Sequence, residues 1–170
     1  GTPSAAAITT TTDDKCVESG GTISLEGRAL TSGETATWSQ TRGPTASIGD
    51  ISASTTTASF TENGNYTIQY TINNGCQSAS ETVSFRVGIQ STIADAGSDQ
   101  SICSPDSQLF LTGNSNLNGT GVWEFLSGPN LPNISNEFDP NTSISGLTNG
   151  TYQFVWTSVP TSSLCTVTKD

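Results

Sequence analysis

The chain has 170 residues, with 15 acidic and five basic side chains, no histidine and a formal net charge of −10. Phosphate binding needs clustered lysine and arginine, so nucleic acid is excluded as an expected partner. No apolar run approaches the roughly 20 residues that a membrane span requires, so no membrane insertion is expected. The chain shows no signal peptide and contains no methionine, which indicates a mature product or an excised piece of a longer polypeptide.

An internal repeat organises the chain. Cys16 and Cys76 are 60 residues apart (76 − 16), and Cys103 and Cys165 are 62 residues apart (165 − 103). Between the cysteines of each pair the same landmarks follow in the same order: Leu25-Glu26-Gly27 and Leu111-Thr112-Gly113, Trp38 and Trp123 in the pattern W-x4-G-P, then Asn63-Gly64 and Asn149-Gly150 before an alternating run with Tyr66 or Tyr152. We therefore predict two homologous domains, residues 1–90 and 91–170.

In chain order, the segments that read as strands alternate apolar and polar residues. They are 22–26, 34–38 and 81–87 in the first repeat, and 108–112 and 152–156 in the second. Their β-branched and aromatic residues, interrupted by Gly, Asn, Pro and Ser, are typical of half-buried strands. No stretch keeps a helical period, so we predict an all-β fold. About seven strands per repeat is the size of an immunoglobulin-like β-sandwich.

Four aromatic residues are the predicted structural core. Trp38 and Trp123 fall where such sandwiches bury a large aromatic residue on strand C, and Tyr66 and Tyr152 fall at the position of a tyrosine corner. Two residues after each tyrosine, an antibody domain has a core cysteine. Here that position holds an apolar residue, so the core is expected to be filled by packing.

The four cysteines are expected to form disulfides within each repeat. Four cysteines allow three pairings, and the repeat favours Cys16–Cys76 with Cys103–Cys165. In the chain-entropy model, closing a loop of this length stabilises a domain by about 4 kcal/mol. The two cores are expected to be small, so such links would stabilise them. Disulfides also indicate an oxidising compartment. The alternative, a metal site, lacks both C-x-x-C spacing and histidine.

Other candidate sites are weaker. Asp95, Asp99 and Asp139 are the calcium candidates, with solvated surface charge as the favoured alternative. Phe125, Phe138 and Tyr70 could form a sugar-binding platform, although a place in or near the core is the favoured interpretation. No carboxylate pair stands out and no serine has a histidine partner, so no catalytic residue and no cofactor are predicted.

The second repeat resembles the PKD-like and immunoglobulin-like repeats of giant cell-surface adhesins in Bacteroidota, including flavobacterial gliding adhesins. The residues that carry the resemblance are Ala94–Cys103, Leu111-Thr112-Gly113-Asn114, Gly121-Val122-Trp123, Ser127-Gly128-Pro129, Asp139-Pro140-Asn141, Ser145-Gly146-Leu147 and Gly150-Thr151-Tyr152. The first repeat matches at fewer positions. The resemblance implies tandem arrays exported by type IX secretion, with no catalytic residues to transfer.

The resulting hypothesis is a non-catalytic, semi-rigid stalk or spacer of a secreted or surface adhesin, acting in adhesion or gliding motility. The expected location is the bacterial cell surface, associated with the outer membrane, and the expected partners are neighbouring repeats of the same polypeptide. The alternatives are a module that binds surface polysaccharide and an accessory domain of a secreted enzyme. The fragment is expected to be monomeric. Only residues 166–170 follow Cys165, so we expect the last strand to be truncated and the polypeptide to continue beyond Asp170, with an open sheet edge there.

Overall fold

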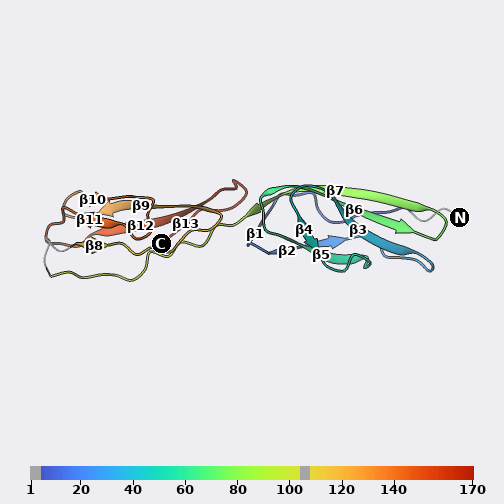
Figure 1. Ribbon diagram of the computed structural model, residues 1–170, viewed down its shortest axis with the longest axis horizontal. Helices are drawn as coiled ribbons and strands as arrows, with labels where there is room; N and C mark the ends of the chain where they lie inside the picture. The colour runs from blue at the N-terminus through green and yellow to red at the C-terminus, as the bar shows by residue number, and fades with distance from the viewer. Residues whose placement is uncertain (1–4, 104–107) are drawn as a thin grey trace. The chain divides into compact units, whose positions relative to one another are not determined.

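The computed structural model describes residues 5–103 and 108–170 and shows them as strands, turns and loops without a helix, which confirms the all-β prediction. None of the described residues therefore forms a helix that could cross a membrane. The chain divides into two compact units, Gly1–Ile89 and Gln90–Asp170 (Figure 1).

The first unit is a sandwich of two sheets. Its strands are β1 (Lys15–Val17), β2 (Thr22–Glu26), β3 (Thr35–Arg42), β4 (Ala46–Ile48), β5 (Thr55–Phe60), β6 (Gly64–Asn73) and β7 (Ser78–Ile89). One sheet has the order β2-β5-β4 and the other has the order β1-β7-β6-β3. With β2 as strand B and β7 as strand G, these orders are B-E-D and G-F-C, the arrangement of an immunoglobulin-like sandwich.

Period-two alternation builds the first core. Along β6, the side chains of Tyr66, Ile68, Tyr70 and Ile72 are fully buried, and the residues between them face outward or are only half-buried. Strand β7 alternates in the same way. Successive strand residues point to opposite faces, so one face of each strand meets the other sheet. The remaining core residues are Leu25, Ala36, Trp38, Ala58, Phe60, Val83, Phe85, Val87 and Ile89.

The second unit has a similar strand order without a counterpart of β1 among its described strands, and all but one of its strands are shorter than their counterparts. Its strands are β8 (Leu109–Phe110), β9 (Gly119–Ser127), β10 (Asn133–Ile134), β11 (Ser143–Ser145), β12 (Gln153–Pro160) and β13 (Thr168–Lys169). The sheets have the orders β10-β11-β8 and β13-β12-β9, which again correspond to D-E-B and G-F-C. Strand β13, in the position of strand G, has two residues where β7 has twelve.

The second core is also smaller. Its buried cluster is Ala94, Leu111, Trp123, Ile144 and Trp156. Phe154 occupies the repeat position of Ile68 but is only half-buried, whereas Ile68 is fully buried. The core of the second unit is therefore less enclosed at Phe154 than the core of the first unit is at Ile68.

The repeated W-x4-G-P motif has the same structural role in both units. A bulge falls between Gln40 and Arg42 on β3, and the register between β9 and β12 shifts beside Gln153. The glycine that follows lies against the tyrosine of the same unit. A Cβ on Gly43, whose φ is 103°, would lie 2.4 Å from the Asn65 oxygen, and one on Gly128 would lie 2.4 Å from the Tyr152 ring. Glycine is required because any side chain would strike these atoms.

Each unit also has a hydrogen bond of the tyrosine-corner kind. The Tyr66 hydroxyl donates to the backbone oxygen of Glu62 at 2.7 Å. In the second unit, the Tyr152 hydroxyl accepts from the backbone N–H of Thr148 at 2.8 Å. Both bonds span four residues and fasten the loop that leads into strand F.

Candidate functional site

The predicted disulfide pairing is wrong. In the structure, Cys76 and Cys103 are free, exposed thiols, and Cys16 and Cys165 are disulfide-bonded. Neither the Cys16–Cys76 pair nor the Cys103–Cys165 pair is therefore present, and the expectation of one disulfide within each repeat fails with them.

The positions along β7 explain why Cys16 and Cys76 cannot meet. Cys16 lies in β1 opposite Gly88, near the end of β7, whereas Cys76 lies in the turn that precedes Ser78, the first residue of β7. Gly88 lies ten positions after Ser78 (88 − 78), and ten steps along a strand span roughly 33 Å. A disulfide needs Cα atoms within about 7 Å. The two cysteines are at opposite ends of one strand.

The three calcium candidates do not gather. The described residues contain no group of three or more Asp, Glu, Cys or His side chains that could hold a metal ion. Asp95 and Asp139 each accept a hydrogen bond from a backbone N–H two residues ahead, at Gly97 and Asn141, both at 2.9 Å. Such bonds stabilise local turns, and Asp99 is exposed.

The predicted core aromatics and the proposed sugar platform take different places. Trp38, Trp123 and Tyr66 are buried, and Tyr152 is half-buried. Of the three platform candidates, Tyr70 is fully buried, Phe125 is half-buried and Phe138 is 58% exposed. They do not form one exposed surface, because Tyr70 is enclosed in the first core.

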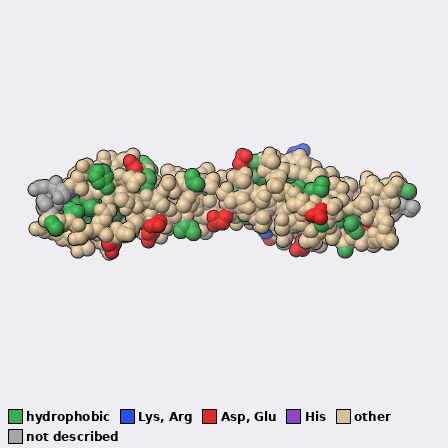
Figure 2. All heavy atoms as spheres, turned by 60° about the horizontal axis from the view of Figure 1, so that its bottom comes forward, with side chains coloured by type: hydrophobic (Ala, Val, Ile, Leu, Met, Phe, Trp, Pro, Cys, Tyr) green, Lys and Arg blue, Asp and Glu red, His purple; other side chains and the backbone are tan. Residues whose placement is uncertain are grey.

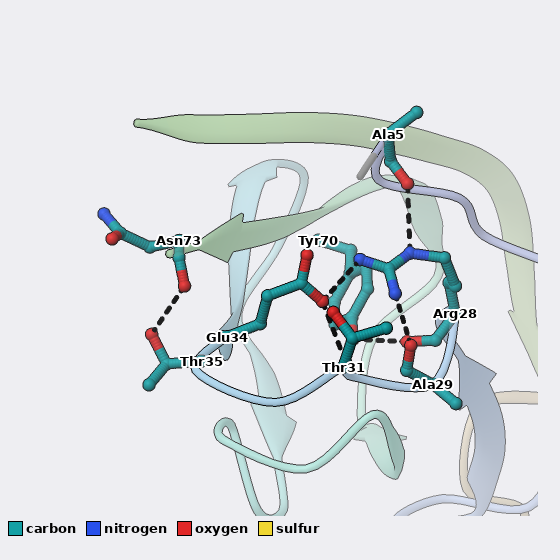
Figure 3. A network of polar contacts seen from close by, with 8 residues as sticks. All are labelled: Ala5, Arg28, Ala29, Thr31, Glu34, Thr35, Tyr70 and Asn73. Atoms are coloured by element: carbon teal, nitrogen blue, oxygen red, sulfur yellow. Dashed lines mark hydrogen bonds and ion pairs between the residues drawn. The ribbon is translucent and has the colours of Figure 1, made fainter. Parts of the chain in front are cut away.

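The first unit holds a partly buried ion pair that the sequence did not reveal (Figure 3). The Arg28 guanidinium lies 2.9 Å from the Glu34 carboxylate, whose side chain is only 5% exposed. The same carboxylate oxygen accepts from the Thr31 N–H at 2.9 Å, and Arg28 Nε donates to the Ala5 oxygen at 3.1 Å. The Tyr70 hydroxyl donates to the Arg28 backbone oxygen at 2.9 Å. Burial raises the pKa of Tyr70, and the whole network holds the turn before β3 against β6.

The second unit has a groove that is a candidate concave site. It has a cavity volume of about 550 Å³, and most of its lining comes from two segments, residues 96–102 and residues 147–154. Leu109, Leu111 and Trp123 lie along it. Its rim is polar, and Leu126, which is 60% exposed, adds an apolar side chain. The groove lies entirely within the second unit.

Three aromatic rings are clustered beside this groove. Phe125 lies 5.9 Å from Phe154 and 6.4 Å from Tyr152 between ring centroids. All three are half-buried, and both Tyr152 and Phe154 line the groove. The Tyr152 hydroxyl is held by Thr148 and by the side chain of Asn130, so its ring cannot easily turn away. Residues 147–154 therefore bring two aromatic rings, those of Tyr152 and Phe154, to the groove where β12 begins.

The face drawn in Figure 2 is largely tan, the colour of uncharged polar side chains and backbone. Acidic side chains are scattered over it and basic ones are few. Among the residues that the structure describes, ten large hydrophobic side chains are exposed, and nine of them, from Ile93 onward, are in the second unit. The exposed apolar surface thus lies mainly on the unit with the smaller core.

No protein-family model and no curated protein matches the sequence. Among solved structures, the chain is similar to extracellular domains 3–5 of Drosophila OTK, with 12% identity and a TM-score of 0.45 over 98% of this chain and 60% of that chain. It is also similar to fibronectin(III)-like modules of Clostridium thermocellum CbhA, with 12% identity and a TM-score of 0.39 over 97% and 90% of the two chains. A third is human CDH23 EC21–23, with 15% identity and a TM-score of 0.40 over 98% and 62%.

This chain therefore spans about three fifths of the OTK and CDH23 fragments. The strand order of each unit is that of an immunoglobulin-like β-sandwich. Sequence reasoning did not identify the groove, because its lining residues are far apart in the sequence.

Proposed function

We propose that the chain is a non-catalytic, load-bearing spacer of a secreted or cell-surface adhesin. We further propose that such units form a tandem array in a bacterial gliding or adhesion protein of the Bacteroidota type. This protein would be exported to the cell surface. The resemblance of residues 94–152 to repeats of such proteins supports these details. Disulfide-bonded cysteines support an oxidising compartment.

The observation that carries the proposal is the pairing of β1 with β7. These strands, close to the two ends of the first unit, run parallel and side by side, with Lys15, Cys16 and Val17 opposite Val87, Gly88 and Ile89. Force that separates the ends of this unit would slide the two strands along each other. All hydrogen bonds of the pair would then bear load together, because a sliding pair cannot open one bond at a time.

A charged contact reinforces the same pair of strands. The Arg86 Nε lies 3.0 and 3.1 Å from the two carboxylate oxygens of Asp14, and the guanidinium also contacts this carboxylate through a second nitrogen. Two-pronged contacts between arginine and carboxylate are geometrically specific. Asp14 directly precedes β1 and Arg86 belongs to β7, so the ion pair crosses the same junction.

The surface suits a crowded array. A net charge of −10 on 170 residues keeps copies apart through repulsion.

Single-molecule pulling on the two ends of the chain tests the proposal. Reductant is included because Cys16, inside β1, is disulfide-bonded. We expect the first unit to unfold in one step at high force. Val17→Pro should lower that force, because proline cannot donate a backbone hydrogen bond and β1 would lose part of its pairing.

The matched control is Ile48→Ala. Ile48 is half-buried in β4, which belongs to the other sheet and packs against the core. Removing its side chain should cost about 2 kcal/mol of unfolding free energy and leave the β1–β7 pair intact. If Ile48→Ala lowers the unfolding force as much as Val17→Pro does, the β1–β7 pair is not the load-bearing element and the proposal fails.

A further inference from the structure

The four cysteines occupy two kinds of position in the repeat. Cys16 and Cys103 each lie six residues before the first residue of strand B (22 − 16 and 109 − 103). Cys76 and Cys165 each lie in the connection between strands F and G, which are β6 and β7 in the first unit and β12 and β13 in the second. We call them the pre-B position and the F–G position.

Each position has a disulfide-bonded cysteine in one unit and a free thiol in the other. At the pre-B position, Cys16 is disulfide-bonded and Cys103 is free. At the F–G position, Cys165 is disulfide-bonded and Cys76 is free. The first unit has no cysteine besides Cys16 and Cys76, and these two lie at opposite ends of β7. A disulfide at the pre-B position therefore does not close on the F–G cysteine of its own unit, and both free thiols stand at positions whose repeat counterparts are disulfide-bonded.

The turn that carries Cys76 is hydrogen-bonded and uncharged. The Asn74 Oδ1 atom accepts hydrogen bonds from the backbone N–H groups of Cys76 at 3.1 Å and Gln77 at 3.0 Å. Such bonds fix a turn, so the exposed thiol is held on a defined surface. No residue from 71 to 80 is charged. The net charge of −10 therefore opposes contact at this turn only from a distance, and physiological salt screens charges more than about 8 Å apart.

The Cys103 thiol is exposed as well, and an exposed apolar residue precedes it. The Ile102 side chain is 36% exposed, so covering it with a partner would add favourable free energy. An unpaired cysteine in a secreted protein points to pairing between molecules. In an oxidising compartment, accessible thiols exchange with disulfides. The exposed thiols of Cys76 and Cys103 both meet this condition.

We propose that Cys103 of one copy of this chain forms a disulfide with Cys76 of a second copy, joining a pre-B position to an F–G position. Because the two linked residues differ, the link is head-to-tail and can continue from copy to copy. The Cys103 thiolate first attacks a small-molecule disulfide, such as oxidised glutathione, and releases one glutathione thiolate. The Cys76 thiolate then attacks the Cys103 sulfur of this mixed disulfide and releases the second. Two protein thiols thus lose two protons and two electrons, and one glutathione disulfide is reduced to two thiols.

This inference needs an oxidising compartment, but it does not depend on the mechanical role of the first unit. The pulling experiment and the linking experiment can therefore fail separately.

The test treats the 170-residue chain with oxidised glutathione and identifies the links by mass spectrometry of non-reduced peptides. We expect a ladder of covalent oligomers on a non-reducing gel, which reductant returns to monomer. Links between Cys76 and Cys103 of different copies should be at least tenfold more frequent than either link between like residues. Random pairing of two exposed thiols would make them only about twice as frequent.

Single variants separate the two positions. Cys76→Ser and Cys103→Ser each change an exposed residue, so both should melt like the wild type. Each alone should stay monomeric under oxidation, and a mixture of the two should give one dimer, joined through the remaining Cys103 and Cys76 thiols. A dimer of either variant with itself, formed as readily as the oligomers of the wild type, would overturn the proposal.

The matched control moves one thiol to another exposed site. The double variant Cys76→Ser, Ser47→Cys places it on β4, which belongs to the other sheet. This variant should form at least tenfold fewer oligomers than the wild type. Equal oligomer formation, links in the random ratio, a Cys76–Cys103 link within one chain, or no link at all would overturn the proposal.

Discussion

Trp123 and Trp156 are directly opposite each other on β9 and β12, with ring centroids 5.0 Å apart and planes tilted by 41°. Trp38 and Tyr70 have the same relationship on β3 and β6, at 4.5 Å and 35°. Cross-strand aromatic pairs contribute packing beyond the area that they bury. In each unit, this pair is the contact between strands C and F around which the core is built.

Gly121→Ala should destabilise the second unit through this pair. A Cβ at position 121 would lie 2.0 Å from the Trp156 ring, so the ring or the strand would have to move. Overpacking of this kind costs about 1–3 kcal/mol. Urea unfolding followed by tryptophan fluorescence measures the loss, and Thr120→Ala, an exposed change one residue earlier, should alter the midpoint little. A midpoint for Gly121→Ala equal to that of the wild type would contradict the packing described here.

Glu34 forms the ion pair in Figure 3, so replacing it should destabilise the first unit more than the position of Glu34 in a turn would suggest. Glu34→Ala leaves Arg28 without its carboxylate and removes the acceptor for the Thr31 N–H. Hydrogen bonds to charged groups contribute about 1.5–3 kcal/mol, so we expect a loss of about 2 kcal/mol in the unfolding free energy of the first unit. The matched control is Glu18→Ala, an exposed glutamate for which we expect less than about 0.5 kcal/mol. Equal effects of both changes would show that the Arg28–Glu34 pair does not stabilise the fold.

Ionisation of Asp14 should make the stability of the first unit depend on pH in the acidic range. The hydrogen bond from Arg86 lowers the pKa of Asp14 below its usual value. The Asp14 carboxyl group then binds its proton less tightly in the folded state than in the unfolded state. Its contribution to the unfolding free energy is therefore present above the unfolded pKa near 4 and is lost as the pH falls through the folded pKa. Asp50 has the same direction of shift because of Ser52. Thermal unfolding of the wild type and Asp14→Asn from pH 7 to pH 2 should show a difference in stability that shrinks below pH 4, and a difference that stays constant over this range would contradict the coupling.

The strands and their landmarks could be predicted from the sequence because they depend on local pattern. The N-G-x-Y motif locates the start of strand F, which is β6, and the predicted place of Trp38 on strand C agrees with its place on β3. These features follow from the two-residue strand period and from the glycine that must pass beside a tyrosine.

The disulfides and the groove could not be predicted in the same way. Cys16 and Cys76 are 60 residues apart in the sequence, but this separation does not show which end of β7 each cysteine is near. Only the strand pairing shows that they lie at opposite ends of β7. The groove is lined by residues 96–102 and 147–154, which only the fold brings together. Phe154 has the same place in the motif as Ile68, yet it is half-buried whereas Ile68 is buried, and the motif does not show this difference.

Tyr66→Phe should test the tyrosine corner of the first unit at neutral and alkaline pH. The change removes the 2.7 Å hydrogen bond from the Tyr66 hydroxyl to the Glu62 oxygen without emptying the core, so we expect a loss of about 1 kcal/mol at pH 7. Burial raises the pKa of Tyr66 above its usual value near 10. The folded state therefore keeps the phenol proton to a higher pH than the unfolded state, and the stability of the wild type should fall as the pH rises above about 10. Denaturant midpoints measured from pH 7 to pH 11 should show a shallower alkaline decline for Tyr66→Phe, and parallel curves for the two proteins would show that ionisation of Tyr66 is not coupled to folding.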